Sequence, residues 1–457
     1  MKTNKIILFL PRSSARLEYG IDVLFTSLLG LEPIIIHTID DFTDSNLPIL
    51  SIHENASKFV NASKFNQPVA YPYLQVYPWV FQSHIDTAFT PEHSTFKEQI
   101  ILFPFIKTEG LLPFDIFSAS VYLLSRYEEY GQIPKDNLGR FSAKQSLAYK
   151  LSVLSKPIVN LWALELKKEL EKQFPQLVFS LPSYQCFPTL DVDQVYAFKH
   201  KPLYIQIGAF VKDVVHTLFH PHQANMLPYR WRFYMQKKED PFNNLLQWTH
   251  FFVENNLRAR FFILMGKYGG VDKSNPSQIP AFCDTIRELN QSKNISVGIH
   301  FSLKSNYKVE LQKKELAALQ QSLGAPIQSN RQHYLILNFP QTYQNLIAQG
   351  ITEDFTMGYA DLPGFRAGIA TPFPYFDLSK NEKTSLTIFP FAFMDGTYRE
   401  YMQCDYAHTL ASMKKLVDEI RGVGGTFICL FHNESLANTP PWEGWKELYT
   451  NLIHYAK

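Results

Sequence analysis

From about residue 181 to the end of the chain, short apolar runs alternate with segments of helical periodicity, and this alternation constrains the fold more than any other feature. It predicts parallel strands joined by crossover helices. The strands are expected at 186–190, 259–264, 295–299, 327–334, 386–391 and 426–431. The helices between them are expected at 243–254, 311–323, 343–348 and 407–421. Such a chain forms an α/β barrel or an open doubly wound sheet, and in both architectures ligands bind at the carboxyl ends of the strands.

The first part of the chain has a different pattern. An apolar strand at 5–10, a helical periodicity over 17–28 that ends at Gly30 and a second strand at 32–36 predict a small α/β unit. Irregular, aromatic-rich sequence then runs to about residue 105, before Asp115, which is placed to cap a helix. No constellation of catalytic residues occurs before residue 180.

The boundary between the two patterns is expected near a proline-containing stretch. A second amphipathic helix is expected at 159–171, and the stretch 173–182, which contains two prolines, follows it. The sequence therefore predicts an N-terminal α/β domain at 1–180, of unknown role, and a catalytic domain at 181–457. Within the second domain, 198–240 does not follow the alternation and is predicted to be an insertion near the strand ends.

The composition predicts a globular protein without a dominant charge. The 457 residues are 46% hydrophobic, and 44 Lys and Arg nearly balance 42 Asp and Glu, so no overall field attracts nucleic acid or an anionic membrane. The apolar run at 6–10 is shorter than the core of a signal peptide, and no run approaches the roughly 20 apolar residues of a membrane span. A cytoplasmic location is therefore expected. The four cysteines lack pair spacing and are expected in the core: Cys186, Cys283, Cys404 and Cys429.

Acidic and imidazole groups follow three of the expected strands. Asp191 and Asp193 come at the end of the first strand, His300 ends a later one and His432 ends the last. A lone histidine at a strand end is usually a satisfied or surface residue, but three such strand ends at one rim indicate a site. Because Asp191 and Asp193 alternate, one can face a metal ion while the other reaches a water molecule. The alternative is a purely structural role, in which the pair caps a turn.

These strand ends resemble the motifs of the polysaccharide deacetylase family, also called the NodB-homology domain or carbohydrate esterase family 4. TLDVD is similar to its first motif, which implies Asp191 as catalytic base and Asp193 as metal ligand. GIHFS is similar to the second motif, which implies His300 as a ligand, and CLFHNE to the last, which implies His432 as general acid. The resemblance implies a distorted (β/α) barrel and a zinc-dependent or other divalent-metal hydrolase that removes an N- or O-acetyl group from a carbohydrate.

The second motif departs from the family pattern. The family has a second histidine four residues after the first, where this sequence has Lys304. SNRQHYL resembles the third motif, and His333 within it could supply the missing nitrogen or instead bind sugar. With His333, the site would be a two-histidine, one-carboxylate site with open positions for water and substrate.

Supporting residues are also expected from the resemblance. Arg331 in SNRQHYL would hold Asp191 as a carboxylate, and Arg366 in GFRAGIATPF competes for the same role. Asp395 in FAFMDGTY would orient His432, although a turn residue before a glycine is an equal alternative. The backbone N–H of Tyr334 is expected to stabilise the oxyanion.

Three functions remain open at this point. The first is a metal-dependent carbohydrate deacetylase, and the second is a catalytically weak carbohydrate-binding or scaffold protein, for which Lys304 argues. The third is a metal-free glycoside hydrolase, which would need Asp395 or Glu434 as a second carboxylate. The N-terminal part resembles the unassigned domain that precedes deacetylase domains in some bacterial proteins, in the stretch LPFDIFSASVYLLSRYEEYG, and this similarity implies no activity.

Overall fold

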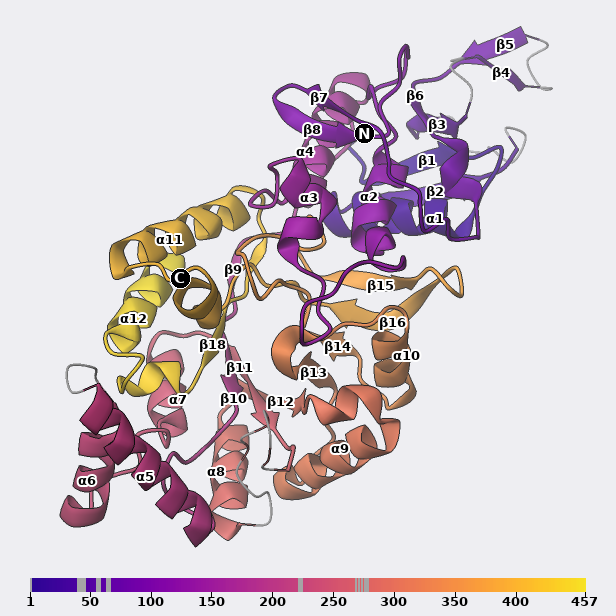
Figure 1. The fold of residues 1–457 in the computed structure, drawn as a ribbon. Coiled ribbons are helices and arrows are strands. Elements are labelled where there is room, and N and C mark those ends of the chain that lie inside the picture. Colours follow the sequence, from indigo (N-terminus) through magenta and orange to yellow (C-terminus); the bar gives the residue numbers. More distant parts are fainter. Residues whose placement is uncertain are drawn as a thin grey trace.

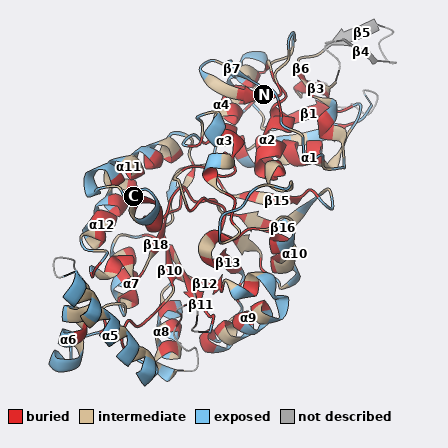
Figure 2. Ribbon diagram, in the orientation of Figure 1, coloured by how far each residue is buried: buried red, intermediate tan, exposed pale blue. Residues whose placement is uncertain are grey.

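The computed structural model describes residues 2–38, 47–54, 59–62, 67–220, 225–267, 269, 272, 274 and 279–457. Figure 1 shows the N-terminal elements gathered around a small sheet and the later elements around a larger one. In Figure 2 the buried residues follow the two sheets and the helix faces that cover them. Within the described residues, no helix is both long and apolar enough to span a bilayer.

The small sheet consists of parallel strands in the order β2-β1-β3-β6. Its strands are β1 (Lys5–Phe9), β2 (Glu32–Ile36), β3 (Ile49–His53) and β6 (Tyr73–Gln75). The expected α/β unit is thus confirmed. Its helix is in two parts, α1 (Ala15–Ile21) and a π-helical continuation (Asp22–Leu28), and Gly30 follows with a φ of 64°.

The stretch expected to be irregular contains strands, so that expectation is wrong. Besides β3 and β6, it holds β4 (Phe59–Ala62) paired with β5 (Gln67–Ala70), and β7 (His93–Phe96) paired with β8 (Gln99–Leu102). The helices after it are α2 (Ile116–Leu124), α3 (Leu147–Lys150) and α4 (Ile158–Gln173). Asp115 caps α2 as expected, because its side chain accepts the backbone N–H groups of Phe117 and Ser118.

The larger sheet has eight strands in the order β15-β16-β14-β13-β12-β11-β10-β18, and its neighbours are parallel except for β15 and β16. The strands that match predicted ones are β10 (Thr189–Val192), β11 (Ala259–Leu264), β12 (Ile295–Phe301), β13 (Ser329–Gln332), β16 (Glu382–Ile388) and β18 (Leu430–His432). The sequence did not predict β14 (Glu353–Asp354) and β15 (Phe373–Asp377). A separate pair joins β9 (Gln185–Cys186) to β17 (Thr426–Phe427).

Helices connect these strands. The predicted ones are α7 (Leu245–Glu254), α9 (Val309–Leu323), α10 (Gln341–Ala348) and α11 (Tyr406–Gly422), whereas α8 (Pro280–Gln291) and α12 (Trp445–Ala456) were not predicted. The predicted insertion at 198–240 contains α5 (Leu203–Phe219) and α6 (Leu227–Gln236). The described chain therefore has a mixed α/β fold with a large, mainly parallel sheet.

The two ends of the large sheet approach each other through one segment. After β16 the chain continues to Met394, which forms a parallel bridge with Leu430 of β18. The backbone N–H of Leu430 also donates to the carbonyl of Phe393 at 3.1 Å. This link brings Asp395 beside the end of β18. A fully closed barrel stays a prediction.

A buried ion-pair cluster joins the N-terminal part to the large sheet. Arg126 and Arg366 both contact Glu129, with Nε–Oε1 distances of 2.8 and 3.0 Å. Arg126 also donates to the backbone carbonyl of Arg366. Elsewhere Tyr19 donates its hydroxyl to the carbonyl of Pro374 at 2.8 Å. The two parts therefore pack together, and the boundary at residue 180 stays a prediction.

Candidate metal and catalytic site

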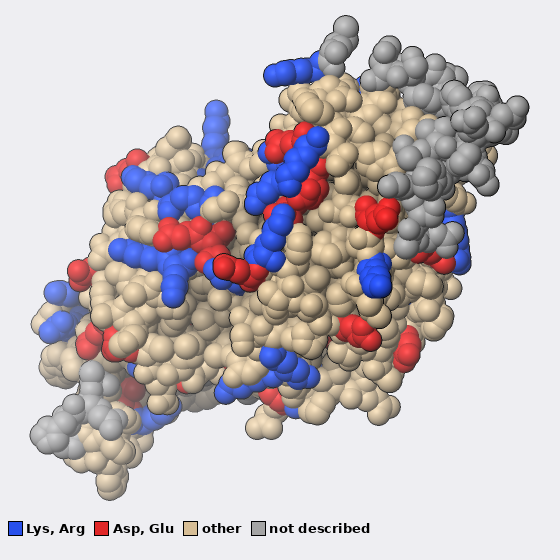
Figure 3. Space-filling view, turned by 90° about the horizontal axis from the view of Figure 1, so that it is seen from above, with Lys and Arg blue, Asp and Glu red and all other residues tan. Residues whose placement is uncertain are grey.

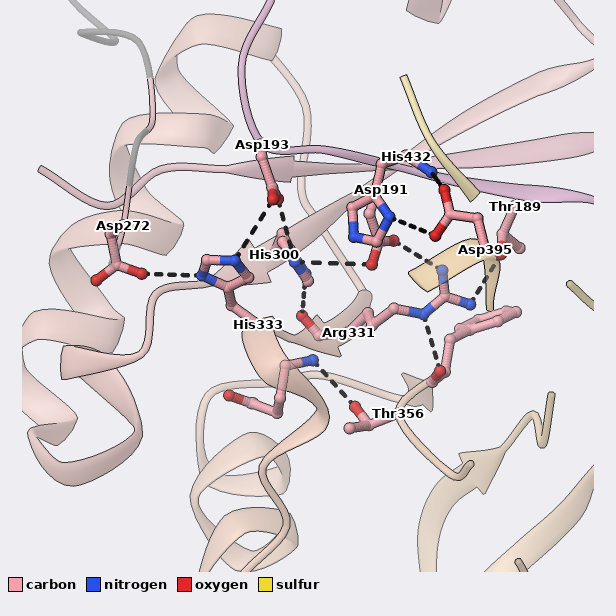
Figure 4. A network of polar contacts seen from close by, with 12 residues as sticks. Thr189, Asp191, Asp193, Asp272, His300, Arg331, His333, Thr356, Asp395 and His432 are labelled. Carbon is pink, nitrogen blue, oxygen red and sulfur yellow. Dashed lines mark hydrogen bonds and ion pairs between the residues drawn. The ribbon is translucent and has the colours of Figure 1, made fainter. Parts of the chain in front are cut away.

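Strands β13, β12, β10 and β18 bring the predicted site residues to one edge of the large sheet, where β11 lies between β12 and β10. Asp191 on β10 is in register with His432 on β18, and His300 on β12 is in register with Arg331 on β13. Because these strands are parallel, their carboxyl ends meet at the same rim. Residues that are far apart in the sequence therefore lie close together, as Figure 4 shows.

Asp193, His300 and His333 form a group that could hold a metal ion. One donor atom from each residue lies within 4.8 Å of the other two. The Nε2 atom of His300 is 3.6 Å from Asp193 Oδ1, and Nε2 of His333 is 3.5 Å from Asp193 Oδ2, too far for good hydrogen bonds. Asp193 Oδ1 and His300 Nε2 are buried without a hydrogen-bond partner. Such unsatisfied donor atoms are costly unless a further group binds them, so this donor set suits a divalent ion.

Both histidines of this group are oriented through their Nδ1 atoms. His300 Nδ1 lies 2.8 Å from the carbonyl oxygen of Arg331 and therefore carries the proton, since a carbonyl can only accept. His333 Nδ1 lies 2.9 Å from Asp272 Oδ1. In both rings Nε2 is left to face the cavity. This is the arrangement of histidine ligands whose second nitrogen is held by a carbonyl or a carboxylate.

Asp272 was not predicted as a site residue. It lies in GKYGGVDKS, among residues with no strand or helix periodicity, and it forms only an isolated bridge with Gly269. Its Oδ1 also accepts the backbone N–H of Leu303 at 3.1 Å, which fixes the carboxylate next to His333. No signal in the sequence pairs Asp272 with a histidine 61 positions later.

The pKa values of the two histidines in this group are shifted in opposite directions. Burial lowers the pKa of His300 to about 4, so its ring is neutral near neutral pH. Burial also opposes the charged form of His333, but Asp193 and Asp272 outweigh it and raise its pKa to about 9. The pKa of Asp193 is lowered despite its burial, chiefly by His333. In the metal-free protein, a proton on His333 therefore balances the charge of Asp193.

Arg331 and Asp191 form a buried charge pair. Arg331 contacts Asp191 Oδ1 at 2.7 Å and Thr189 Oγ1 at 2.8 Å, and its Nε donates to the carbonyl of Phe355 at 2.9 Å. Its guanidinium carbon also lies 4.5 Å from the ring centre of Phe262. Arg366, the alternative partner of Asp191, instead pairs with Glu129 and is turned toward the N-terminal part. The geometry therefore gives Arg331 the contact with Asp191.

His432 is held by Asp395 on the segment that links the sheet ends. The Nδ1 atom of His432 lies 2.8 Å from Asp395 Oδ1, and its backbone N–H donates to Asp395 Oδ2 at 2.8 Å. Burial opposes protonation of His432, but Asp395 and then Asp193 raise its pKa well above the ordinary value. His432 is therefore stabilised in the protonated form that a general acid requires.

These residues surround a cavity of about 250 Å³. Its walls include Asp191, Asp193, His300, His333, Tyr334, His432 and Glu434, with Arg140, Glu400, Tyr401 and Trp442 at further positions. Arg140 comes from the N-terminal part and was not predicted. Its Nε contacts Asp136 at 2.7 Å and one terminal nitrogen donates to the hydroxyl of Tyr401 at 2.8 Å. The N-terminal part thus contributes a positive charge to the cavity.

Comparisons with known proteins give only distant relationships. A sequence-family model described as a family of unknown function (DUF7033) matches residues 6–175, which include Arg140 but none of the metal-site residues. No curated protein sequence matches the chain. The polysaccharide deacetylase Bc1974 from Bacillus cereus is 10% identical with a TM-score of 0.29, over 59% of this chain and 85% of that one. The allantoinase PuuE is 11% identical with a TM-score of 0.37, over 59% and 84% of the two chains.

A third solved structure has a different activity again. The 4-alpha-glucanotransferase from Thermococcus litoralis is 11% identical with a TM-score of 0.35, over 60% of this chain and 37% of that one. The three neighbours are a deacetylase, an allantoinase and a glucanotransferase. These distant likenesses therefore leave the reaction open, and the residues of the site have to carry the argument.

Proposed function

We propose that this chain is a metal-dependent hydrolase that removes an N- or O-acetyl group from a carbohydrate, on a barrel of the polysaccharide deacetylase type. The observation that carries the proposal is one cavity of about 250 Å³ lined by three potential metal ligands together with Asp191 and His432. The motifs around these residues resemble those of the polysaccharide deacetylase family in the same chain order. Together these features match hydrolysis of an acyl group better than ligand binding alone.

Asp193, His300 and His333 would hold the ion, with zinc as the best candidate for a set of two imidazoles and one carboxylate. A divalent ion bound there would polarise the acyl carbonyl and lower the pKa of a water molecule. Lys304, at the position of the expected histidine, is exposed in a short 3₁₀ helix, Lys304–Tyr307, and takes no part in the ligand set.

Two of the remaining residues would transfer protons, one as acceptor and one as donor. Asp191, in contact with Arg331, would accept a proton from the attacking water. His432, charged and oriented by Asp395, would donate a proton to the departing amine or alcohol. Tyr334 lines the cavity with a left-handed backbone at φ 60°, and its N–H would stabilise the oxyanion.

The cavity also offers groups that suit a sugar. Trp442 and Tyr401 lie in its wall, and aromatic rings are suitable platforms for the apolar faces of sugar rings. Arg140 would position a hydroxyl, carboxylate or phosphate group of the substrate. In the glycoside hydrolase alternative Asp395 is unsuited as the second carboxylate, because both its oxygens accept N–H groups of His432 and it is fully buried, which leaves Glu434 in the cavity wall for that role.

Metal binding is the first test. The zinc content and zinc affinity of the intact chain are measured beside the variants Asp193→Ala, His300→Ala and His333→Ala, with His408→Ala, an exposed histidine on α11, as control. We expect about one ion per chain and a loss of roughly ten-fold or more in affinity for each site variant, but none for the control. If only His333→Ala leaves the affinity unchanged, the third ligand is a different residue.

Deacetylation is the second test. Release of acetate from N- and O-acetylated oligosaccharides is measured for the zinc-loaded chain and for Asp191→Asn, which keeps the shape of the base and removes its charge. We expect release by the intact chain and a loss of at least about 100-fold in the variant. A chain that binds zinc and acetylated sugar but releases no acetate would support the alternative, a catalytically weak carbohydrate-binding protein.

A further inference from the structure

Helices α5 and α6 form a hairpin whose polar residues lie between the helices. Arg230 of α6 contacts Asp213 of α5 at 2.9 Å, and Tyr234 donates its hydroxyl to Gln206. Along α5 no residue is buried. The helices are thus joined through charge and hydrogen bonds, whereas paired helices of a water-soluble protein usually bury their apolar sides against each other.

The apolar side chains of the hairpin are exposed, and Figure 2 shows exposed residues along α5. Ile207, Val211 and Leu218 are spaced so that they share one face of α5, and they are 55%, 53% and 73% exposed. The hairpin's apolar face consists of Leu203, Tyr204, Ile207, Phe210, Val211, Val215, Leu218 and Phe219 of α5 with Trp231 and Met235 of α6. Contiguous exposed apolar surface of this kind marks an interaction site.

Basic residues accompany this face. Between residues 198 and 240 the sequence has seven Lys and Arg against three acidic residues, of which Asp213 is paired with Arg230 and Asp240 is buried against backbone N–H groups. The balanced charge of the whole chain conceals this local excess. Figure 3 shows another face of the molecule, where Lys and Arg lie beside Asp and Glu without such a separation. The hairpin therefore combines exposed apolar side chains with a local positive charge.

We propose that the hairpin's apolar face binds the surface of an anionic lipid bilayer. An amphipathic helix with Leu, Phe and Trp on one side and Lys and Arg around it lies in the interface, with its apolar side in the lipid and its basic residues near the anionic headgroups. A second copy of the chain is a weaker candidate for the occupant, because two equally basic hairpins would repel each other. This attachment lies in the plane of the bilayer and needs no spanning helix.

The base of the hairpin is fixed to the rest of the protein. Both carboxylate oxygens of the buried Asp240 accept backbone N–H groups, from Ala197, Phe198 and Lys199, in the stretch between β10 and α5. Lys201 also donates to Gln194 at 2.6 Å. The apolar face is therefore held in a defined place on the molecule.

Co-sedimentation of the full-length chain with vesicles tests the proposal. One set of vesicles contains phosphatidylcholine with phosphatidylglycerol and the other contains phosphatidylcholine alone. The apolar face is altered in the triple variant Ile207→Gln, Val211→Gln and Leu218→Gln, and the charge in the double variant Lys237→Gln and Lys238→Gln. Ile106→Gln is the matched control, because Ile106 is fully exposed but lies outside the hairpin. Far-UV circular dichroism shows that each variant keeps its fold.

We expect the intact chain to sediment with the anionic vesicles, with partitioning at least about ten-fold weaker for the triple variant and unchanged for Ile106→Gln. The double lysine variant should bind the anionic vesicles more weakly and lose part of its salt dependence. Absence of vesicle binding, or equal binding by the folded triple variant, would overturn the proposal. A dimer in sedimentation velocity that the triple variant abolishes, without vesicle binding, would instead assign the face to a second copy of the chain.

Discussion

Asp272→Asn separates the charge of Asp272 from its hydrogen bonds and so tests how the protein prepares His333 for a metal ion. The same atom, Oδ1, contacts His333 Nδ1 at 2.9 Å and accepts the N–H of Leu303 at 3.1 Å. Asparagine provides an oxygen at this place, so both contacts are kept while the negative charge is lost. The variant should fold normally, because Leu303 retains its acceptor.

The magnitude follows from competition between the metal ion and a proton. Asp193 and Asp272 outweigh burial and raise the pKa of His333 to about 9. A histidine must be neutral to bind a metal ion. At about pH 7 a histidine with a pKa of about 9 is neutral in roughly one molecule in 100. Because the pKa is raised, metal affinity increases with pH. The apparent Kd of the intact chain should therefore fall about ten-fold for each pH unit between about pH 6 and 8.

Asp272→Asn removes one of the two carboxylates that raise the pKa of His333. Its pKa should fall, so the dependence of Kd on pH should level off at a lower pH than in the intact chain. The limiting Kd at high pH should be about 10-fold weaker, since loss of a carboxylate behind a histidine ligand costs about 10–100-fold. The two effects oppose each other near neutral pH, so the whole pH series has to be compared.

Zinc titration against a chromogenic chelator over this pH range measures both effects. Asp405→Asn is the control, because Asp405 Oδ2 makes a similar contact, 2.6 Å, with Nδ1 of the exposed His408 outside the site. A Kd of the intact chain that does not change with pH would refute the proton on His333. Superimposable curves for Asp272→Asn and the intact chain would refute the role of Asp272.

Three further predictions concern the neighbouring residues. Arg331→Met should lower the free energy of unfolding by about 3–5 kcal/mol in urea, because Asp191 is left as a buried charge without its partner; an unchanged midpoint would contradict this. Asp395→Asn should lower the pKa of His432, so that the fall of kcat/KM at alkaline pH moves to lower pH, as a pH–rate profile on an acetylated oligosaccharide measures. Arg140→Ala should raise KM about ten-fold with little change in kcat, and a normal KM in steady-state kinetics would exclude Arg140 from substrate binding.

The sequence predicts the fold best where apolar runs are continuous. The strand expected at 259–264 coincides with β11, because a strand buried on both sides leaves a run of apolar residues. By contrast, β14 has only two residues, too few to give a sequence pattern. It is a strand because it pairs with β13 and β16 on either side. The hairpin of β7 and β8 turns at Lys97 and Glu98, which have φ angles of 47° and 66° but lack the glycine or asparagine that usually marks such a turn.

The residues of the candidate site likewise include some that the sequence predicts and some that it does not. Asp191, His300 and His432 could be expected at one rim because each ends an apolar strand. Asp272 and Arg140 carry no such signal, since only tertiary contacts bring them to the cavity. Arg366 was a plausible alternative because Gly364, two residues before it, suggested a close approach of the backbone. In the structure this close approach is to the N-terminal part. A Cβ on Gly364 would lie 2.5 Å from the carbonyl oxygen of Leu154, so this glycine permits contact with the N-terminal part.

The presence of Lys304 where the resemblance implies a histidine is compatible with the proposed ligand set. A metal ion requires donor atoms at certain positions in space, and their order along the chain is immaterial. Strands β12 and β13 are adjacent and parallel, with His300 in register with Arg331, so His333 lies only two residues beyond the partner of His300. A donor just after β13 can therefore lie near His300, and the donor atoms of Asp193, His300 and His333 are within 4.8 Å of one another. His333, directly after β13, is oriented by the carboxylate of Asp272, which contacts its Nδ1 atom. The proposed ligand and the group that orients it are therefore both present.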